Sequence, residues 1–223
     1  MHATGFAGQW DGAADWLAEL ANRTSHPPFV VDVGCGDGRM LAKLRDHGVP
    51  GCGFDISESF VQAARERGLD ASVADAVKLN VPLATLVIAV GEVLAYRNAA
   101  GEVALENVIA AAAKALLPGG SLVFDVTSTE VVAGASWLDG GNWFVASRNR
   151  IVDDANLTRE ITVFFKQGDT WRRSDEVHHQ QLFDTGKVAQ RLREAGLTVR
   201  PLSSIGDVEL LPGRAAFLAT KPG

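Results

Sequence analysis

Three glycines at alternate positions form the pattern in this chain that is best suited to holding a ligand. They are Gly34, Gly36 and Gly38, in the stretch VDVGCGDGR over residues 31–39. An apolar stretch precedes them and a helical pattern follows, so we expect a sharp turn from a strand into a helix. Because glycine has no Cβ, a ligand can approach the backbone closely at such a turn. The pattern therefore predicts a binding site at the carboxyl end of this strand.

Acidic residues in the same turn indicate the charge of the ligand. A dinucleotide-binding turn has the spacing GxGxxG. In this chain Arg39 stands where the third glycine of that pattern would be, and Gly38 comes one residue before it. Asp32 and Asp37 would repel a pyrophosphate, whereas an ammonium or sulfonium cation suits them. A nicotinamide-dependent oxidoreductase is therefore the weaker alternative.

Two further carboxylates follow at the ends of the next predicted strands. Asp55 lies about 20 residues past the first glycine, where a carboxylate can accept both hydroxyls of a ribose. Its other interpretation is a cap for the next helix. Asp75 can take the amino group of an adenine while the backbone N–H of Ala76 donates to a ring nitrogen. Acidic residues also end strands without any ligand. The Asp75–Ala76 pair therefore supports a binding site mainly because it follows the glycine turn and Asp55 in the expected order of strand ends.

A parallel sheet is needed to bring these strand ends together. The pattern predicts strands at 29–33, 51–56, 71–74, 83–90 and 121–126, and helices at 8–23, 39–46, 57–68 and 102–117, with Ser57 as an N-cap. This alternation is typical of an α/β fold with helices on both faces of the sheet.

The pattern changes after the fifth predicted strand. Residues 127–142 are rich in Gly, Ser and Thr and are expected to form a loop. Three candidate strands follow at 143–152, 157–166 and 170–183, which we expect to form an antiparallel meander added to the main sheet. Asp184 or Thr185 then caps a helix to Glu194, and the last two strands are expected at 197–203 and 214–220, linked by a turn.

Composition narrows the class of protein. The 223 residues are 47% hydrophobic and 22% charged, which favours a globular domain with a real core. The net charge of −6 disfavours a nucleic-acid acceptor. We see neither a secretory signal nor a membrane span, and expect a cytoplasmic monomer or homodimer. Cys35 and Cys52 have no zinc-site spacing, so we expect reduced thiols near the core and no metal.

From Phe29 to its end, the sequence resembles the class I S-adenosylmethionine-dependent methyltransferases. VDVGCGDGR resembles the first motif of that family, GFDIS its acidic second-strand motif, and ADA at 74–76 its adenine-reading motif. LLPGGSLVFDV at 116–126 and LLPGRAAFLATKP near the end resemble its fifth strand and its final antiparallel strand. The resemblance implies a Rossmann-like, doubly wound, mostly parallel seven-stranded sheet with an antiparallel last strand. We expect one domain over 1–223, in which the loop and inserted meander at 127–183 cover the active site.

The resemblance also implies a role for each matching residue. Gly34, Cys35 and Gly36 would cradle the methionine part of the cofactor, with Asp32 near its amino group. The other implied contacts are with the ribose (Asp55), the adenine (Ile56, Asp75, Ala76) and the methionine moiety (Val90, Gly91). The cofactor would be S-adenosylmethionine and the product S-adenosylhomocysteine.

The residues after the fourth strand bear on the acceptor. The stretch GEVLAY at 91–96 lacks the Asn/Asp-Pro-Pro-aromatic motif of enzymes that methylate adenine or glutamine amides, and the chain lacks the Pro-Cys of cytosine C5 enzymes. Both absences favour a small-molecule O or N acceptor, with Glu92 and Tyr96 as candidate contacts.

The third strand of the meander offers a candidate base. Period-two alternation places Glu176 and His178 on one face, with His179 on the other. If the first face borders the pocket, His178 is the candidate general base and Glu176 a polar anchor; otherwise this is a solvated face. We expect core positions, or an aromatic pocket for an amine, for four aromatic residues: Trp137, Trp143, Phe164 and Phe165.

We therefore expect an S-adenosylmethionine-dependent methyltransferase that acts on a small molecule by in-line displacement. A protein that binds the cofactor without catalysis would carry the same motifs. An aminopropyl transferase shares the fold, but this chain lacks a clear acidic groove motif after the fourth strand.

Overall fold

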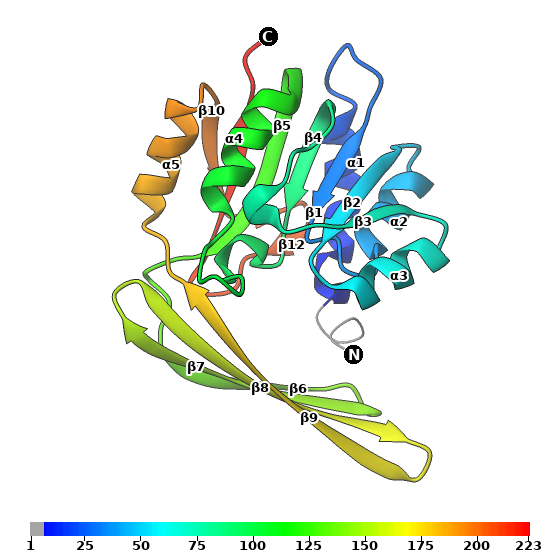
Figure 1. Cartoon of the computed structure of the whole chain (residues 1–223), viewed down its shortest axis with the longest axis vertical. Helices are drawn as coiled ribbons and strands as arrows, with labels where there is room; N and C mark the ends of the chain where they lie inside the picture. Colours follow the sequence, from blue (N-terminus) through cyan, green and yellow to red (C-terminus); the bar gives the residue numbers. More distant parts are fainter. Residues whose placement is uncertain (1–6) are drawn as a thin grey trace.

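The structure, a computed structural model, describes residues 7–223, and its main sheet has seven strands in the order β10-β13-β5-β4-β1-β2-β3 (Figure 1). The first five strands along the chain are mutually parallel, whereas β13 runs antiparallel to both β5 and β10. This confirms the expected mostly parallel sheet with an antiparallel last strand. The strands are β1 (Val30–Val33), β2 (Gly51–Asp55), β3 (Asp70–Val73), β4 (Ala84–Ala89), β5 (Leu116–Thr127), β10 (Thr198–Leu202) and β13 (Arg214–Thr220).

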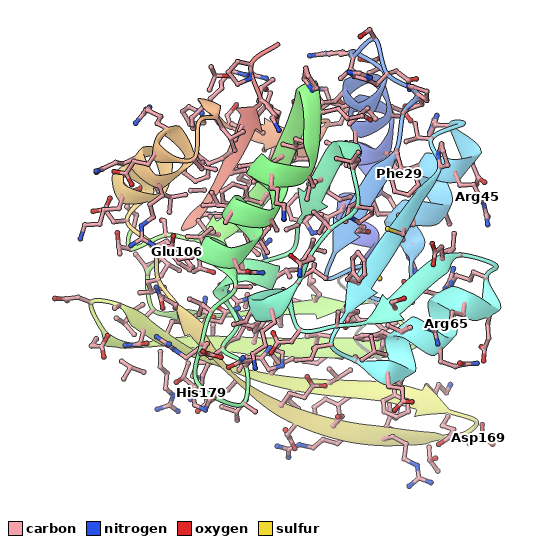
Figure 2. The ribbon with its side chains drawn as sticks, turned by 45° about the horizontal axis from the view of Figure 1, so that its top comes forward. Phe29, Arg45, Arg65, Glu106, Asp169 and His179 are labelled. Atoms are coloured by element: carbon pink, nitrogen blue, oxygen red, sulfur yellow. The ribbon has the colours of Figure 1, made fainter. Side chains whose placement is uncertain are left out.

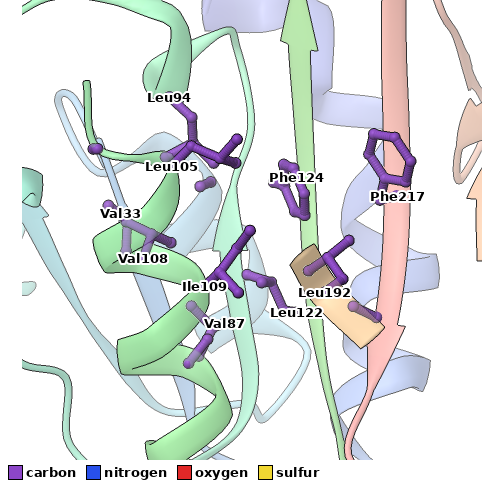
Figure 3. Close-up of a cluster of buried hydrophobic side chains, with 14 of the residues drawn as sticks. Val33, Val87, Leu94, Leu105, Val108, Ile109, Leu122, Phe124, Leu192 and Phe217 are labelled. Atoms are coloured by element: carbon purple, nitrogen blue, oxygen red, sulfur yellow. The ribbon is translucent and has the colours of Figure 1, made fainter. Parts of the chain in front are cut away.

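Helices cover both faces of this sheet. One face carries the 3-10 helix η2 (Ala7–Ala13) with α1 (Ala14–Ala21), α2 (Arg39–Asp46) and α3 (Glu58–Glu66); the other carries α4 (Leu105–Ala115) and α5 (Thr185–Glu194). The predicted helix at 8–23 is therefore a 3-10 segment followed by a short α-helix. Side chains of α4 and α5 pack on Phe124 of β5 and Phe217 of β13, whose rings stack 5.4 Å apart (Figure 3).

Two predicted helix starts are confirmed by their caps. The Ser57 side chain accepts a hydrogen bond from the Phe60 N–H at the start of α3. Asp184 accepts one from the Lys187 N–H at the start of α5. Short polar side chains at these positions satisfy amides that the helix itself leaves unpaired. Two short 3-10 segments, η3 (Ala76–Lys78) and η4 (Val93–Ala95), follow β3 and β4.

The inserted strands form the expected antiparallel meander, which is a separate four-stranded sheet and does not pair with the main sheet. The order is β6 (Gly134–Asp139), β7 (Trp143–Asp153), β8 (Asn156–Gln167) and β9 (Thr170–Gln181), all antiparallel. They leave the main sheet after β5, which already has β4 and β13 as neighbours. The four-stranded sheet instead lies beyond the ends of the main strands (Figure 1).

Two elements differ from the expected loops. Strand β6 lies within 127–142, where no strand was expected; all of its residues are exposed, so it lacks the alternation that marks a half-buried strand. A short hairpin lies between β10 and β13, where only a turn was expected. Its two strands, β11 (Ser204–Ile205) and β12 (Val208–Glu209), have two residues each.

The two faces of the four-stranded sheet have different surroundings. Val145, Arg159 and His178 occupy one face, which borders a cavity and is called the inner face below. His179 lies on the opposite, outer face and is exposed, as expected (Figure 2).

Candidate active site

A cavity of about 1240 Å³ lies between the main strand ends and the inner face. All ten residues predicted to contact a cofactor line it, namely Asp32, Gly34, Cys35, Gly36, Asp55, Ile56, Asp75, Ala76, Val90 and Gly91. Glu92, Tyr96 and His178 line it as well. The parallel sheet thus brings together residues from four strand ends and from the inserted sheet.

The glycine turn has a backbone that other residues would strain. Gly34, Gly36 and Gly38 have φ values of 75°, 55° and 78°. A Cβ at Gly34 would lie 2.4 Å from a methyl of Val93, so packing also excludes a side chain there. A Cβ at Gly36 would meet no protein atom within 4 Å. Because Gly36 lines the cavity, such a Cβ would lie beside open space and not against protein atoms.

Asp55 is held by two backbone amides. One carboxylate oxygen accepts from the Gly36 N–H and the other from the Ser57 N–H, both at 2.8 Å. Ser57, rather than Asp55, caps α3. The two amides fix the carboxylate at the cavity wall, and each oxygen keeps a lone pair for a ligand hydroxyl.

Asp75 is also partly engaged by the protein. It accepts from the Val77 N–H at 3.0 Å and from the Asn98 side-chain amide at 2.9 Å. Asn98 lines the cavity too and was not predicted. The loop after β4 therefore meets the end of β3 beside the position predicted to read adenine.

Asp32 is the carboxylate whose surroundings most favour a cationic ligand. It is 4% exposed and lines the cavity. Burial, and then the negative charge of Asp55, raise its pKa to about 7. Among residues 7–223, no group hydrogen-bonds to it or forms an ion pair with it. A cation at this position would favour the ionised form and lower this pKa.

The other half of the cavity holds a buried network of two acids and two arginines. Arg214 donates to Asp125 and forms an ion pair with Glu92, both at 3.0 Å. Arg159, from β8, binds the Glu92 carboxylate through both terminal nitrogens of its guanidinium. Thr127 also donates to Glu92, at 2.9 Å. Glu92 is thus an internal anchor in this structure, where the sequence suggested an acceptor contact.

Charge balance explains the ionisation of this network. Burial alone would raise the pKa of Glu92, but Arg214 and Arg159 outweigh it and hold that pKa below its usual range. For Asp125, which is fully buried, burial outweighs Arg214 and raises the pKa. The guanidinium of Arg214 also lies 5.7 Å from the ring centre of Trp10, in a cation–π contact.

His178 lies on the inner face beside Tyr96. Their rings meet edge to face with centres 5.2 Å apart, and a His178 ring nitrogen lies 3.0 Å from a Glu176 carboxylate oxygen. Burial, and then Glu92, raise the pKa of Tyr96 to about 12, so its phenol stays protonated at neutral pH. Glu176 contacts His178 and does not itself line the cavity.

A family model described as a methyltransferase domain matches residues 8–202. The chain belongs to this methyltransferase family. It is a class I S-adenosylmethionine-dependent methyltransferase, as the motifs indicated.

Solved structures similar to this methyltransferase agree with its fold. An S-adenosylmethionine-dependent methyltransferase from Clostridium acetobutylicum has a TM-score of 0.78 at 17% identity, covering 100% of this chain and 96% of that one. The sugar N-methyltransferase KedS8 from Streptoalloteichus has a TM-score of 0.76 at 21% identity, covering 98% and 90%. CalS10, an amino pentose methyltransferase from Micromonospora echinaspora solved with its cofactor, has a TM-score of 0.74 at 19% identity, covering 96% and 91%.

A curated relative matches a shorter segment of the methyltransferase. The tRNA (carboxymethyluridine(34)-5-O)-methyltransferase alkbh8 of Xenopus tropicalis is 40% identical over 73 residues, which are 33% of this chain. The match spans only 10% of that protein's length. The likeness therefore covers one segment of a much longer protein.

Several features of the methyltransferase were predicted only in part. Both cysteines are free and buried, as expected. Trp143 packs on Val145 and Ile161. Trp137 is 69% exposed, so a core position is wrong for it, but it lines the cavity and the alternative of an aromatic pocket stays a prediction. Among the described residues, no cluster of three His, Cys, Asp or Glu side chains suits a metal ion, and no helix is long and apolar enough to cross a membrane.

Proposed function

We propose that this enzyme transfers the methyl group of S-adenosylmethionine to a nitrogen or oxygen of a small molecule bound against the inner face. The observation that carries the proposal is the shared cavity, which is lined both by the motif residues of the strand ends and by His178 of the inserted sheet. In this proposal residues 1–223 form one methyltransferase domain, and the insertion at 127–183 covers its active site.

The residues of the strand ends fit the cofactor. Asp55, oriented by two amides, would bind the ribose hydroxyls, and Asp75 with Ala76 would read the adenine edge. Asp32 would pair with the ammonium group, which gives this buried carboxylate the cationic partner that it lacks among residues 7–223. When bound, S-adenosylmethionine supplies a methyl group on a cationic sulfur, which an in-line nucleophile takes and which leaves S-adenosylhomocysteine.

The acceptor half of the cavity suits a neutral or basic molecule with hydroxyl groups. Glu92, Asp125, Arg159 and Arg214 neutralise one another, so little uncompensated charge faces this space. The remaining inner-face lining combines polar and apolar side chains, among them Ser136, Ser147, Asn149, Val145 and Ile161. KedS8 and CalS10, which act on a sugar and an amino pentose, support an acceptor of this kind. The net charge of −6 disfavours a tRNA.

His178 is the general base of the proposed mechanism. In this role the imidazole of His178, at the cavity wall, takes the proton that the nucleophile loses as it bonds to the methyl carbon. Glu176 orients the ring through the 3.0 Å contact, and Tyr96 packs against it. No other proton transfer is needed, so the residues act mainly by holding the two reactants in line and excluding water.

A labelled-methyl assay tests this function. The protein is incubated with radiolabelled S-adenosylmethionine and separate pools of amino sugars, other small amines, phenols, carboxylic acids and bulk tRNA. We expect transfer to a small-molecule pool, and a loss of at least about 100-fold in His178→Gln. His179→Gln is the matched control, since His179 is the adjacent residue on the outer face, and should retain full activity. Transfer to tRNA alone, or to no pool at all despite cofactor binding, contradicts the proposal.

A further inference from the structure

Arg159 occupies the position on β8 directly opposite His178 on β9. Its other cross-strand neighbour is Asn149 on β7, whose side-chain oxygen accepts from the Arg159 Nε at 2.8 Å. The two terminal nitrogens of the same guanidinium bind Glu92. The guanidinium of Arg159 therefore links the inserted sheet, next to His178, to Glu92, which lies outside that sheet.

Glu92 is in turn fixed to the main sheet. It follows Gly91, and one oxygen of Asp125 accepts from the N–H groups of both residues, at 2.6 and 3.2 Å. Glu92 has φ 65°, the only positive φ of a non-glycine residue in the described part of the chain. A left-handed backbone costs energy for a residue with a Cβ, so its surroundings must hold it there. This conformation, together with Arg159 and Arg214, fixes the Glu92 carboxylate.

We propose that Glu92 and Arg159 are positioning residues that set the place of His178 relative to the methyl donor. The proposal rests on the proposed function, in which Gly91 borders the cofactor and His178 is the base. Glu92 then lies next to the cofactor site, and Arg159, which binds Glu92, lies directly opposite the base on the adjacent strand. Neither is required to touch a substrate.

Burial and shape support a positioning role over a general electrostatic one. The side chains of Arg159 and Glu92 are 16% and 3% exposed, so solvent screens their attraction weakly. The two terminal nitrogens of the Arg159 guanidinium donate to the Glu92 carboxylate, and its Nε donates to Asn149. This arrangement fixes the orientation of the group as well as its distance. A lysine would keep the charge and lose this planar geometry. The two kinds of contribution can therefore be separated by substitution.

The experiment compares Arg159→Gln, Arg159→Lys and Glu92→Gln with the control Arg150→Gln. Arg150 is an arginine on the neighbouring strand β7 whose ion pair with Glu160 is exposed on the outer face. Circular dichroism and thermal unfolding first establish that each variant folds. Amide hydrogen exchange then follows peptides covering 157–161 and 176–180, and calorimetry measures the dissociation constant of S-adenosylhomocysteine.

We expect exchange in both peptides to be at least tenfold faster in Arg159→Gln and Glu92→Gln, and unchanged in Arg150→Gln. The dissociation constant of S-adenosylhomocysteine should stay within about threefold of the wild-type value. With the best small-molecule acceptor of the panel, kcat should fall at least tenfold while the KM for S-adenosylmethionine stays the same. Arg159→Lys should recover part of the exchange protection but little of kcat.

Wild-type exchange in the 176–180 peptide of both Arg159→Gln and Glu92→Gln would overturn the inference. So would a loss of cofactor affinity as large as the loss of kcat, which would indicate a general structural role. The exchange measurement needs no acceptor, so it decides the inference even if the panel gives no turnover. Full activity of His178→Gln would instead contradict the proposed base and leave the exchange result standing.

Discussion

Gly36 and Asp55, which lie 19 residues apart in the chain, are joined by a 2.8 Å hydrogen bond from the Gly36 N–H to the Asp55 carboxylate. This bond ties the glycine turn after β1 to the end of β2. It also orients the carboxylate that we assign to the ribose. The two strongest motif positions in the sequence therefore form one structural unit at the cavity wall.

Replacing Asp55 should weaken cofactor binding strongly. In Asp55→Ala the ribose hydroxyls lose a charged acceptor, and the amides of Gly36 and Ser57 lose their partner. Hydrogen bonds to a charged group contribute about 1.5–3 kcal/mol each, so losing two of them should lower the affinity for S-adenosylhomocysteine by at least about 100-fold. Calorimetric titration measures this, with Asp70→Ala at the exposed start of β3 as the control. Unchanged affinity in Asp55→Ala would refute the ribose role.

The two glycines of the turn should respond differently to alanine. Gly34→Ala places a Cβ 2.4 Å from Val93, so we expect it to lower the melting temperature, with partial recovery in the double variant Gly34→Ala, Val93→Ala. Gly36→Ala meets no protein atom and carries only a backbone strain of about 1–2 kcal/mol. It should fold and yet lose cofactor binding, because its methyl group projects into the cavity. Thermal unfolding and calorimetry together check both outcomes; normal binding by Gly36→Ala would show that the ligand lies elsewhere.

Asp32 should make the stability of the free enzyme depend on pH. Its pKa is about 7 in the folded protein and near 3.8 when unfolded, so the folded state holds the extra proton between these values. The Asp32 contribution therefore favours folding at low pH and is lost as pH rises from about 4 through 7. In Asp32→Asn this loss is absent, and we expect up to about 4 kcal/mol higher stability than wild type at pH 8, by urea unfolding.

The same carboxylate should link cofactor binding to proton release. A bound ammonium favours ionised Asp32, so affinity should fall as pH drops below about 7 and binding at pH 6.5 should release a proton. Calorimetry in two buffers of different ionisation enthalpy measures that proton. Asp32→Asn should show weaker binding and no such release; a proton release equal to that of wild type would assign it to another group.

Removing Arg214 should lower the stability of the folded protein, because it leaves buried carboxylates without their cation. Arg214→Gln leaves Asp125, which is fully buried, without its cation. We expect a loss of about 3–5 kcal/mol at pH 8. The pKa of Asp125 is already raised in the folded protein, so protonation should restore part of the stability as pH falls towards 5. Urea unfolding at both pH values checks this against Arg200→Gln, an exposed residue of β10, which should match wild type.

The elements that the sequence predicted well are those with local signals. The glycine turn, the Ser57 and Asp184 caps and the apolar central strands all depend on residues within a few positions of one another. Strand β6 was missed because all of its residues are exposed, so its sequence does not alternate between apolar buried and polar exposed positions. Its identity depends on pairing with β7, which no local pattern reveals.

The charged network was missed for a related reason. Asp125 stands in an otherwise apolar strand, and its partner Arg214 lies 89 residues away. Glu92 and Arg159 are separated by 67 residues. Each residue looks ordinary in its own segment, and only the meeting of β4, β5, β13 and β8 gives the four a common role. Glu92 was identified as a site residue from its position after β4, but its partners could not be.

A crystal structure with S-adenosylhomocysteine bound tests the central claim most directly, because the claim concerns where the cofactor lies relative to Asp55 and His178. We predict both ribose hydroxyls within hydrogen-bond distance of Asp55, the amino group beside Asp32, and the sulfur facing the space bordered by His178. A ligand bound outside this cavity, or one whose ribose makes no contact with Asp55, would contradict the account.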